Sequence, residues 1–251
     1  MDRATKVLTL TEIPQTAEPG VDLAVASTAK QVTDWFASVD QSRFTIKSIH
    51  YQSIDVIKNG EGKIVKILFV KFRAEVVDTS TPPKPVPGIV FARGGAVAVL
   101  ALFECEGKTY VVVTVQPRVP VGKFNFVEIC AGMLDGSGNF GGVAAKELKE
   151  ELGIELSEDD LTDLTELAGY SGGFFLSPGA CEETIRLYAF RKQVTSDDLE
   201  EMEGKCTGAL DENEQITLKI ITVDDLLTLP DAKSIVAHAL YTKFGHLIKL
   251  I

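Results

Sequence analysis

Two long runs of β-branched and aromatic residues dominate the first third of the chain. They cover Phe44–Ile57 and Lys63–Val77, and the Asn59-Gly60 pair lies between them. Asn-Gly between two such runs is a strong signal for a tight β-hairpin. Apolar residues over Ser27–Ser38 recur at helical spacing. We therefore predict an amphipathic helix followed by a hairpin, which together form a small N-terminal β-rich domain.

A proline-rich stretch follows the hairpin. Ser80–Gly88 reads STPPKPVPG and holds four prolines in nine residues. Proline cannot donate a ladder hydrogen bond, so such a stretch predicts a linker or turn. We place the domain boundary here, with residues 1–85 in the N-terminal domain and residues 86–251 in the second.

The remainder of the chain alternates between strand and helix patterns. AVAVLALFE and TYVVVTVQ flank a Glu106-Gly107 turn, and NFVEICAGM reads as a further strand. Helical patterns follow, with an N-capped short helix at Ser157. TIRLYAFRKQV and ITLKIITV are strands, and Val223–Leu229 and Pro230–Phe244 are helical. This order predicts the α/β class, as an α/β/α sandwich around a mixed sheet.

A carboxylate-rich helix follows the third of these strands. KELKEELGI, at 146–154, carries Glu147, Glu150 and Glu151 and closes at Gly153. Helix residues three and four apart share a face, and like charges there repel by roughly 0.2–0.5 kcal/mol per pair. A hard divalent cation would turn this cost into a binding site. The alternative is a solvated surface face, which Lys/Glu-rich helices often have.

The helical wheel separates these charges. Ala144, Ala145, Leu148 and Leu152 form one apolar arc at about 100° per residue. Glu147 and Glu151 lie at its edge, so we expect them to be ordered and partly desolvated. Lys146 and Lys149 lie away from the arc, on the solvent side.

The wider segment resembles the Nudix box, whose usual form ends in Arg-Glu-apolar-any-Glu-Glu-any-Gly-apolar. Gly132 fits its first glycine, and the residues from Glu147 to Ile154 fit its end at the correct spacing. Two positions depart from the pattern: Gly138 stands where a Glu is expected, and Lys146 stands where an Arg is expected. The three helix glutamates are all present, so the departures affect the loop more than the metal ligands.

The flanking segments resemble the ADP-ribose and ADP-sugar diphosphatase branch of that family, and their amino-acid sequences are most similar to those of the plant-type enzymes. Four segments carry this likeness between about residues 90 and 190: RGGAVAVLAL from Arg93, Gln116-Pro117-Arg118, VEICAG at Val127–Gly132, and SPGACEE at Ser177–Glu183. Cys130 replaces the proline that is usual in the third segment. Together, and in this order, the segments are far more specific than any one alone.

The resemblance implies roles for particular residues. Glu147, Glu151 and the carbonyl of Ala131 are expected to bind Mg²⁺ or Mn²⁺, with Glu150 available for a second ion. Glu183 matches the general base, Glu182 is the second candidate, and a base on the helix, with Glu150 first, stays open. Guanidinium groups offer forked donors to phosphate. The expected substrate-binding residues are Arg93, Arg118, Glu128, Ser177, Pro178 and Gly179.

Composition narrows the partners. A net charge of −11 and a pI near 4.8 argue against a broad nucleic-acid surface. No apolar run reaches the roughly 18 residues of a membrane span. The four cysteines show no CxxC spacing, and no signal peptide is visible, so we expect reduced thiols and a cytoplasmic location. The thin hairpin and the resemblance favour a homodimer built on the N-terminal domain. The alternative is an extension that packs only on its own catalytic domain.

The sequence therefore predicts metal-dependent hydrolysis of a nucleoside diphosphate sugar of the ADP-glucose or ADP-ribose type. The products would be a nucleoside monophosphate and a sugar phosphate. A UDP-sugar diphosphatase is the nearest enzymatic alternative. A catalytically decayed Nudix-fold binding or regulatory protein is the alternative from a different class.

Overall fold

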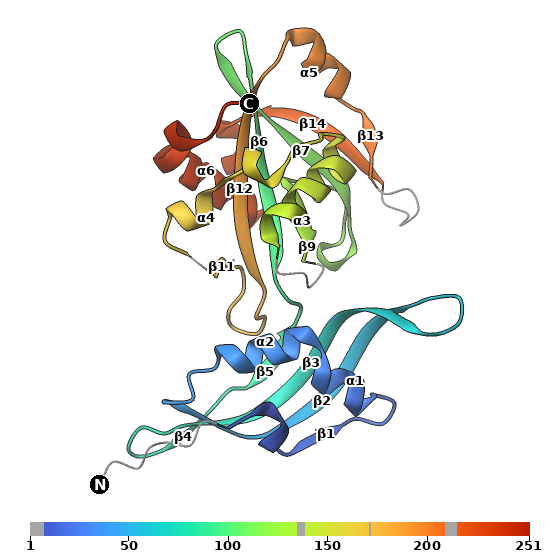
Figure 1. The fold of residues 1–251 in the computed structure, drawn as a ribbon, viewed down its shortest axis with the longest axis vertical. Helices are drawn as coiled ribbons and strands as arrows, with labels where there is room; N and C mark the ends of the chain where they lie inside the picture. Colours follow the sequence, from blue (N-terminus) through green and yellow to red (C-terminus); the bar gives the residue numbers. More distant parts are fainter. Residues whose placement is uncertain (1–7, 135–138, 171, 209–214) are drawn as a thin grey trace. The chain divides into compact units, whose positions relative to one another are not determined.

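The computed structural model describes residues 8–134, 139–170, 172–208 and 215–251 (Figure 1). The chain forms two compact units. The first comprises Met1–Gly94 together with Phe175–Glu183, and the second comprises Gly95–Phe174 together with Thr184–Ile251. A short loop far along the sequence therefore belongs to the N-terminal unit.

The first unit is built on the predicted hairpin. Its two long antiparallel strands are β2 (Phe44–Lys58) and β3 (Ile64–Asp78), which confirms the hairpin prediction. Three short strands complete a five-stranded sheet: β1 (Gln15–Ala17), β4 (Lys84–Val86) and β5 (Ile89–Ala92). A short turn of 3₁₀ helix, η1 (Leu10–Glu12), precedes β1.

Two helices cover one face of this sheet. Val70, Phe72 and Ala74 alternate along β3 with exposed Lys71 and Arg73, so one face of the strand is apolar and the other polar. Helices α1 (Leu23–Thr28) and α2 (Lys30–Ser38) bury that apolar face with Ala26, Val32 and Phe36. The single helix predicted over 27–38 is thus two, which meet at Ala29.

The proline-rich stretch is not a linker. Strands β4 and β5 both pair with β3, and β4 includes Pro85, so part of the proline-rich stretch belongs to the first sheet. Gly88 permits this pairing, because any Cβ there would overlap the Ala74 carbonyl. These two strand pairings keep β4 and β5 in the first sheet. The compact units therefore divide between Gly94 and Gly95 rather than at the predicted residue 85.

The second unit holds a mixed sheet in the order β10–β12–β6–β7–β14–β13. Strands β6 (Ala96–Cys105) and β12 (Thr184–Gln193) are parallel, whereas β6, β7 (Lys108–Arg118) and β14 (Ile216–Thr222) are antiparallel. β8 (Lys123–Glu128) pairs with β7, and β9 (Cys130–Met133) pairs with β6. The short strands are β10 (Thr162–Asp163), β11 (Phe174–Phe175) and β13 (Cys206–Thr207).

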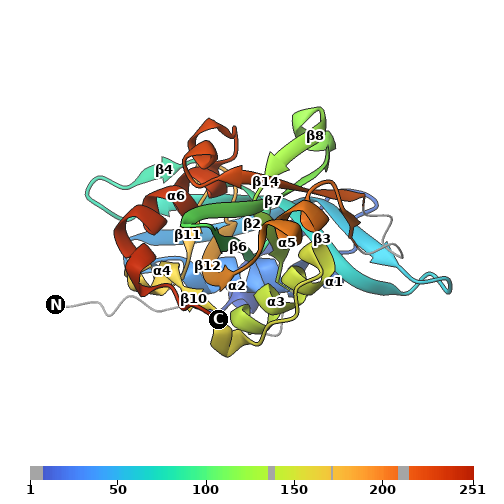
Figure 2. The same ribbon diagram turned by 90° about the horizontal axis from the view of Figure 1, so that it is seen from above.

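Helices α3 (Phe140–Glu147) and α6 (Ala232–Phe244) lie on opposite faces of this sheet (Figures 1 and 2). Val97, Val99 and Ala101 of β6 pack in one core with Ala144 and Leu148 of the α3 segment. The result is the predicted α/β/α sandwich. The other helical segments are η2 (Val119–Val121), η3 (Leu148–Leu152), η4 (Glu158–Asp160), α4 (Leu164–Leu167), α5 (Ser196–Met202), η6 (Asp224–Thr228) and η7 (Gly245–Leu247).

Several elements differ from those predicted. The strand predicted through NFVEICAGM is two strands, because the chain leaves β7 after Glu128 and joins β6 at Cys130. Helices α4 and α5 were not foreseen, while the capped turn at Ser157 is present as η4. Within the described residues, none of the helices has the length and apolar character needed to cross a bilayer.

Candidate metal and substrate site

The carboxylate-rich helix has an unusual second half. It begins after Asn139, whose side chain accepts the Gly142 N–H at 2.9 Å. From Leu148 to Leu152 the backbone widens into a π turn, a feature often found at functional sites. Gly153 ends it with φ +70°, the left-handed conformation that glycine tolerates best. The π turn changes the direction in which the last two glutamates leave the axis.

Glu151 is the most buried acid of this helix, with 4% of its surface exposed. Its carboxylate accepts the backbone N–H of Ala131 at 3.1 Å, and the Gln116 amide lies at 3.5 Å. The Cys130 thiol also hydrogen-bonds this carboxylate. Burial raises the pKa of Glu151 to about 7, and the negative charges of Glu147 and Glu128 add to that rise.

Glu147 packs directly against the start of the motif. A Cβ at Gly132 would overlap the Glu147 carboxylate, so a larger residue there would displace the Glu147 side chain. Glycine at the start of the pattern therefore lets Glu147 lie against β9. Glu147 and Glu151 thus lie beside consecutive residues of one strand.

The strand ladder leaves the Ala131 carbonyl available. The Leu134 N–H donates to the Gly95 carbonyl at 3.0 Å, which sets the hydrogen-bonded positions between β9 and β6. Ala131 pairs with Ala98 at a position between those bonds, so its N–H and C=O point away from β6. The N–H donates to Glu151, and the carbonyl opens on the same side of β9.

Glu128 is held by two cations. Its side chain is 4% exposed and lies 2.6 Å from Arg118 Nε and 2.8 Å from Lys233 Nζ. Lys233 also contacts Asp231 at 2.8 Å, and Asp231 caps the start of α6. Lys233 was not among the site residues predicted from the sequence. A lysine in the first turn of a helix opposes the helix dipole, so it signals a nearby acidic partner.

Glu150 lies in a different environment from its neighbour. Its side chain is 37% exposed, and its carboxylate is 3.5 Å from the exposed Lys146 Nζ. The structure therefore brings together Glu147, Glu151, Glu128 and Ala131, whereas Glu150 faces a surface lysine. Gly138, the other departure from the motif, lies outside the described residues.

The donor set fits a hard divalent cation. Carboxylate and carbonyl oxygens are the ligands that Mg²⁺ prefers, and Glu151 has neutral donors and negatively charged neighbours. Across the described ranges, however, no three His, Cys, Asp or Glu side chains already converge as a finished metal cage.

The loop candidates belong to the first unit. Arg93 Nε lies 3.0 Å from Glu183 Oε1, and the Glu183 side chain is 11% exposed. The neighbouring Glu182 accepts the Gly94 N–H at 2.7 Å. Burial raises the pKa of Glu182, although the backbone N–H groups of Gly94 and Arg93 oppose the rise. Ser177 begins a tight turn in which its carbonyl accepts the Cys181 N–H at 3.0 Å.

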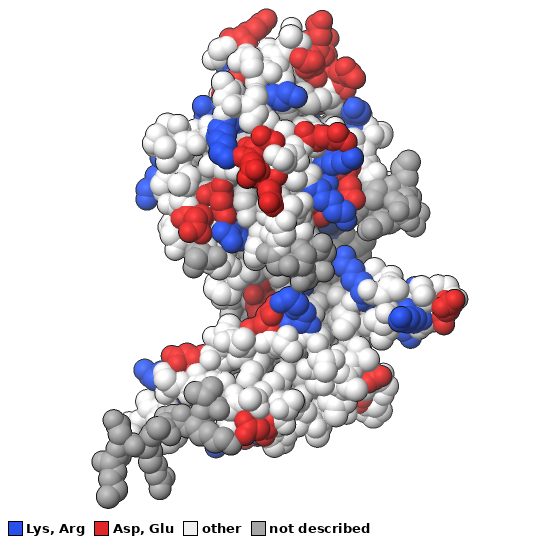
Figure 3. Space-filling view, viewed as in Figure 1, with Lys and Arg blue, Asp and Glu red and all other residues white. Residues whose placement is uncertain are grey.

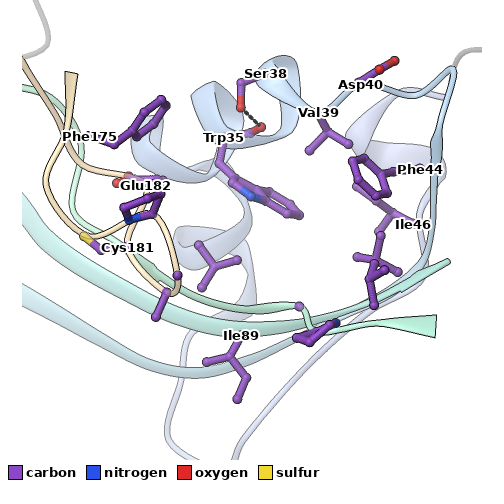
Figure 4. Close-up of a pocket in the computed structure, with 18 residues that line it drawn as sticks. Trp35, Ser38, Val39, Asp40, Phe44, Ile46, Ile89, Phe175, Cys181 and Glu182 are labelled. Atoms are coloured by element: carbon purple, nitrogen blue, oxygen red, sulfur yellow. Dashed lines mark hydrogen bonds between the residues drawn. The ribbon is translucent and has the colours of Figure 1, made fainter. Parts of the chain in front are cut away.

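A largely apolar cavity of about 470 Å³ lies in the same unit (Figure 4). Trp35 and Phe44 line it together with Phe175 and the loop from Pro178 through Gly179 to Glu182. Ser38 at its rim donates to the Trp35 carbonyl at 2.7 Å. One wall of the cavity is thus the segment that carries the candidate base.

Surface charge is finely mixed on the face drawn in Figure 3. Acidic and basic side chains alternate there in small groups among the described residues. Acidic residues outnumber basic ones, 36 to 25, across the sequence. A phosphate-bearing ligand would therefore depend on a bound cation and on local arginines rather than on a broad positive surface.

The comparisons define the class of protein. Residues 92–241 match the NUDIX domain, which covers more than half of the chain. The chain belongs to the Nudix family. Nudix hydrolase 14, chloroplastic, of Arabidopsis thaliana is 42% identical over 201 residues, which cover 78% of this chain and 62% of that protein. The chain thus spans less than two thirds of that relative's length.

A solved structure supports the fold independently. The crystal structure of an ADP compounds hydrolase superposes with a TM-score of 0.51 and 15% identity, covering 80% of this chain and 94% of that one. At this identity the likeness concerns the fold alone. The predicted family and architecture are confirmed, while the roles of the individual site residues stay predictions.

Proposed function

We propose that this protein hydrolyses the pyrophosphate linkage of a nucleoside diphosphate sugar of the ADP-glucose or ADP-ribose type. The observation that carries the proposal is the gathering of Glu147, Glu151 and Glu128 around the Ala131–Gly132 strand. The family match and the relative named as a Nudix hydrolase support the reaction class. The ADP-sugar preference rests on the segments flanking the motif.

Mg²⁺ or Mn²⁺ would be held by Glu147, Glu151 and the Ala131 carbonyl. A bound ion would supply charge neutralisation of the phosphoryl oxygens and a more acidic bound water. The chain's own contribution is a rigid scaffold. The Ala131 N–H holds one Glu151 oxygen, and the absence of a Cβ at Gly132 leaves room for the Glu147 carboxylate beside β9.

The remaining roles follow from the reaction. Hydrolysis forms a bond from water oxygen to one phosphorus, while the bridging oxygen leaves with the other phosphate. A base must take a proton from that water, and Glu183 is our candidate. Arg118 donates to Glu128 through Nε, so its terminal nitrogens are directed elsewhere and suit a phosphate. Ser177, Pro178 and Gly179 shape the turn that carries Glu183.

We also propose a homodimer that uses the first unit. The apolar face of its sheet is already covered by α1 and α2, so the hairpin itself does not demand a partner. The support comes from apolar side chains left exposed, among them Ile57, Val65, Ile89 and Phe91, at 46%, 59%, 56% and 36%. Light scattering at micromolar concentration tests the assembly, and a monomer would contradict it.

The reducing compartment also remains our proposal. All four cysteines are free thiols in the structure, which suits the cytoplasm. The Arabidopsis relative is named as chloroplastic, and this concerns that protein. Cell fractionation followed by immunoblotting measures the location directly.

A substrate panel tests the proposed function. Purified protein is incubated with ADP-glucose, ADP-ribose and UDP-glucose, with Mg²⁺, with Mn²⁺ and with EDTA, and products are separated by ion-exchange chromatography. We expect AMP and a sugar phosphate in the metal-containing samples, with kcat/KM highest for an ADP-sugar. Higher kcat/KM for UDP-glucose would establish the UDP-sugar alternative. Binding without product under every metal condition would establish the decayed binding protein.

A further inference from the structure

The loop from Phe175 to Glu183 is attached to the edge of the first sheet. The Phe91 N–H of β5 donates to the Ala180 carbonyl at 2.8 Å, and Phe91 forms a parallel bridge with Cys181. The loop thus extends the sheet by a short pairing. Glu182 and Glu183 follow this anchor directly, just before β12 begins at Thr184.

Glu182 hydrogen-bonds to the backbone at Gly94, just after β5. One carboxylate oxygen accepts the Gly94 N–H at 2.7 Å, and the other is buried without a hydrogen bond within the described chain. Gly94 has φ +88°, and a Cβ there would approach Gln31 to 3.2 Å. A buried carboxylate committed to a backbone N–H is suited to fixing a turn. It is poorly placed to exchange protons with a substrate water.

Arg93 holds the adjacent acid. Its Nε lies 3.0 Å from Glu183 Oε1 in an ion pair, although the N–H does not align as a hydrogen bond. Its guanidinium also lies 5.6 Å from the centre of the Phe69 ring, and Phe69 packs on Phe91 at 5.1 Å. The aromatic pair therefore holds the arginine beside β5, the strand that anchors the loop.

We propose that Arg93 is a positioning residue that holds the Glu183 carboxylate, and that Glu182 fixes the turn from which Arg93 projects. This inference rests on the proposed function, because it assigns Glu183 as the base of that reaction. It replaces two sequence-based roles: Arg93 as a phosphate contact and Glu182 as the second base. A base displaced by about 1 Å can cost 10²-fold in rate, so such anchoring has a kinetic consequence.

A double-mutant cycle separates positioning from phosphate binding. The proteins are wild type, Arg93→Met, Glu183→Gln and the double variant, assayed for kcat and KM with ADP-glucose and ADP-ribose. We expect Arg93→Met to lower kcat by about 10- to 100-fold with KM within about threefold. The double variant should be no slower than Glu183→Gln, because Arg93 acts through Glu183. Arg43→Met is the matched control, since Arg43 pairs with Asp78 at the surface.

A different pattern overturns the assignment. If Arg93 contacts the substrate phosphate, KM rises in both backgrounds and the two losses multiply. Arg93→Lys keeps the charge, so it should recover part of kcat if the ion pair is what matters. For the turn, Glu182→Gln keeps an oxygen acceptor for the Gly94 N–H and should retain more kcat than Glu182→Ala. Equal losses in these two variants contradict the backbone role.

Amide hydrogen exchange without substrate makes the anchor testable apart from activity. Glu182→Ala should speed exchange at Gly94 and Phe91, and Arg93→Met should speed it within 175–183, relative to wild type. Glu61→Ala, in the exposed hairpin turn, should leave these amides unchanged. Unchanged exchange in both test variants overturns the anchor. Failure of wild type to hydrolyse any sugar nucleotide would instead refute the proposed function, and the exchange data would still decide the anchor.

Discussion

The protein has two groups of acidic side chains in different electrostatic environments: a helix group, Glu147 and Glu151, and a loop group, Glu182 and Glu183. In the second unit, Glu151 is buried beside Glu147 and Glu128, and its direct partners are neutral donors. In the first unit, Glu183 has the guanidinium of Arg93, and Glu182 has a backbone N–H. The charge of Glu147 adds to the raised pKa of Glu151, and in our proposal a bound cation would offset the negative charge of this pair. Glu183 is instead paired with a cation of the chain itself, whereas Glu182 is held by a backbone N–H.

Glu128 shows that burial alone does not make a metal ligand. It is as buried as Glu151, yet Arg118 and Lys233 both contact its carboxylate. The partners of Glu151 within the described residues are the Ala131 N–H, the Gln116 amide and the Cys130 thiol, all of them neutral. The difference between these two acids, rather than the number of glutamates, indicates where a metal ion would bind.

The largest expected effect comes from neutralising the helix group. Glu151→Gln keeps the side-chain volume and removes the charge, so we expect kcat/KM to fall by about 10³-fold. In wild type, Mg²⁺ at ten times its Kd should stabilise the fold by about 1.4 kcal/mol, and this gain should vanish in the variant. Kinetic assays and thermal melts with and without Mg²⁺ measure both.

Glu155→Gln is the matched control for that variant. Glu155 pairs with Lys149 at the surface and is 75% exposed, so its change should leave activity and the Mg²⁺ response near wild type. Near-normal turnover of folded Glu151→Gln would remove Glu151 from the metal site.

Neutralising the loop group should give a smaller loss of a different kind. We expect Glu183→Gln to lower kcat by about 10²-fold, the lower range for a lost general base. Because Glu183 is not among the proposed metal ligands, the Mg²⁺-dependent rise in Tm should persist. Loss of the Mg²⁺ response in this variant would erase the contrast between the two groups. Retention of full kcat would return the base to the helix, with Glu150 the first candidate.

The buried network around Glu128 should matter for stability. Lys233→Met removes one of the two cations that contact the buried Glu128 and also the cation that contacts Asp231, so we expect a loss of about 3 kcal/mol in the free energy of unfolding. Lys243→Met, on the exposed side of the same helix, should change it by less than about 0.5 kcal/mol. Urea denaturation compares the two. Equal losses would show that the contacts of Lys233 are energetically unimportant.

The smallest effect is expected at Lys146, which stands where the usual motif has an arginine. Lys146 is 61% exposed and contacts only the partly exposed Glu150 among its stated ion pairs. Lys146→Arg, which restores the usual residue, should alter kcat by less than about threefold, and Lys146→Met should alter stability by less than about 0.5 kcal/mol. A tenfold rise in kcat of Lys146→Arg would contradict this and show that lysine at this position limits the rate.

The local features of the chain could be predicted from its amino-acid pattern. The β-branched and aromatic runs Phe44–Ile57 and Lys63–Val77, joined through Asn59-Gly60, predicted the hairpin, because both signals are local in the chain. The wheel predicted that Glu151 would lie against the core and Lys146 would face solvent, since helix geometry places both relative to Leu148 and Leu152. The motif spacing identified the family, because its glycine and glutamates occupy sterically constrained positions.

The pairing of segments that are far apart in the sequence became visible only in the folded chain. No local pattern tells that Lys84–Val86 rejoins β3, or that Phe175–Glu183 belongs to the N-terminal unit, because those ladders depend on residues far apart in sequence. Lys233 reaches Glu128 across 105 positions, and Arg93 lies beside Glu183 for the same reason. The chemistry of the side chains was enough to predict the candidate site residues. Which charged groups contact one another, and hence the role each can have, depends on the long-range pairing of the chain.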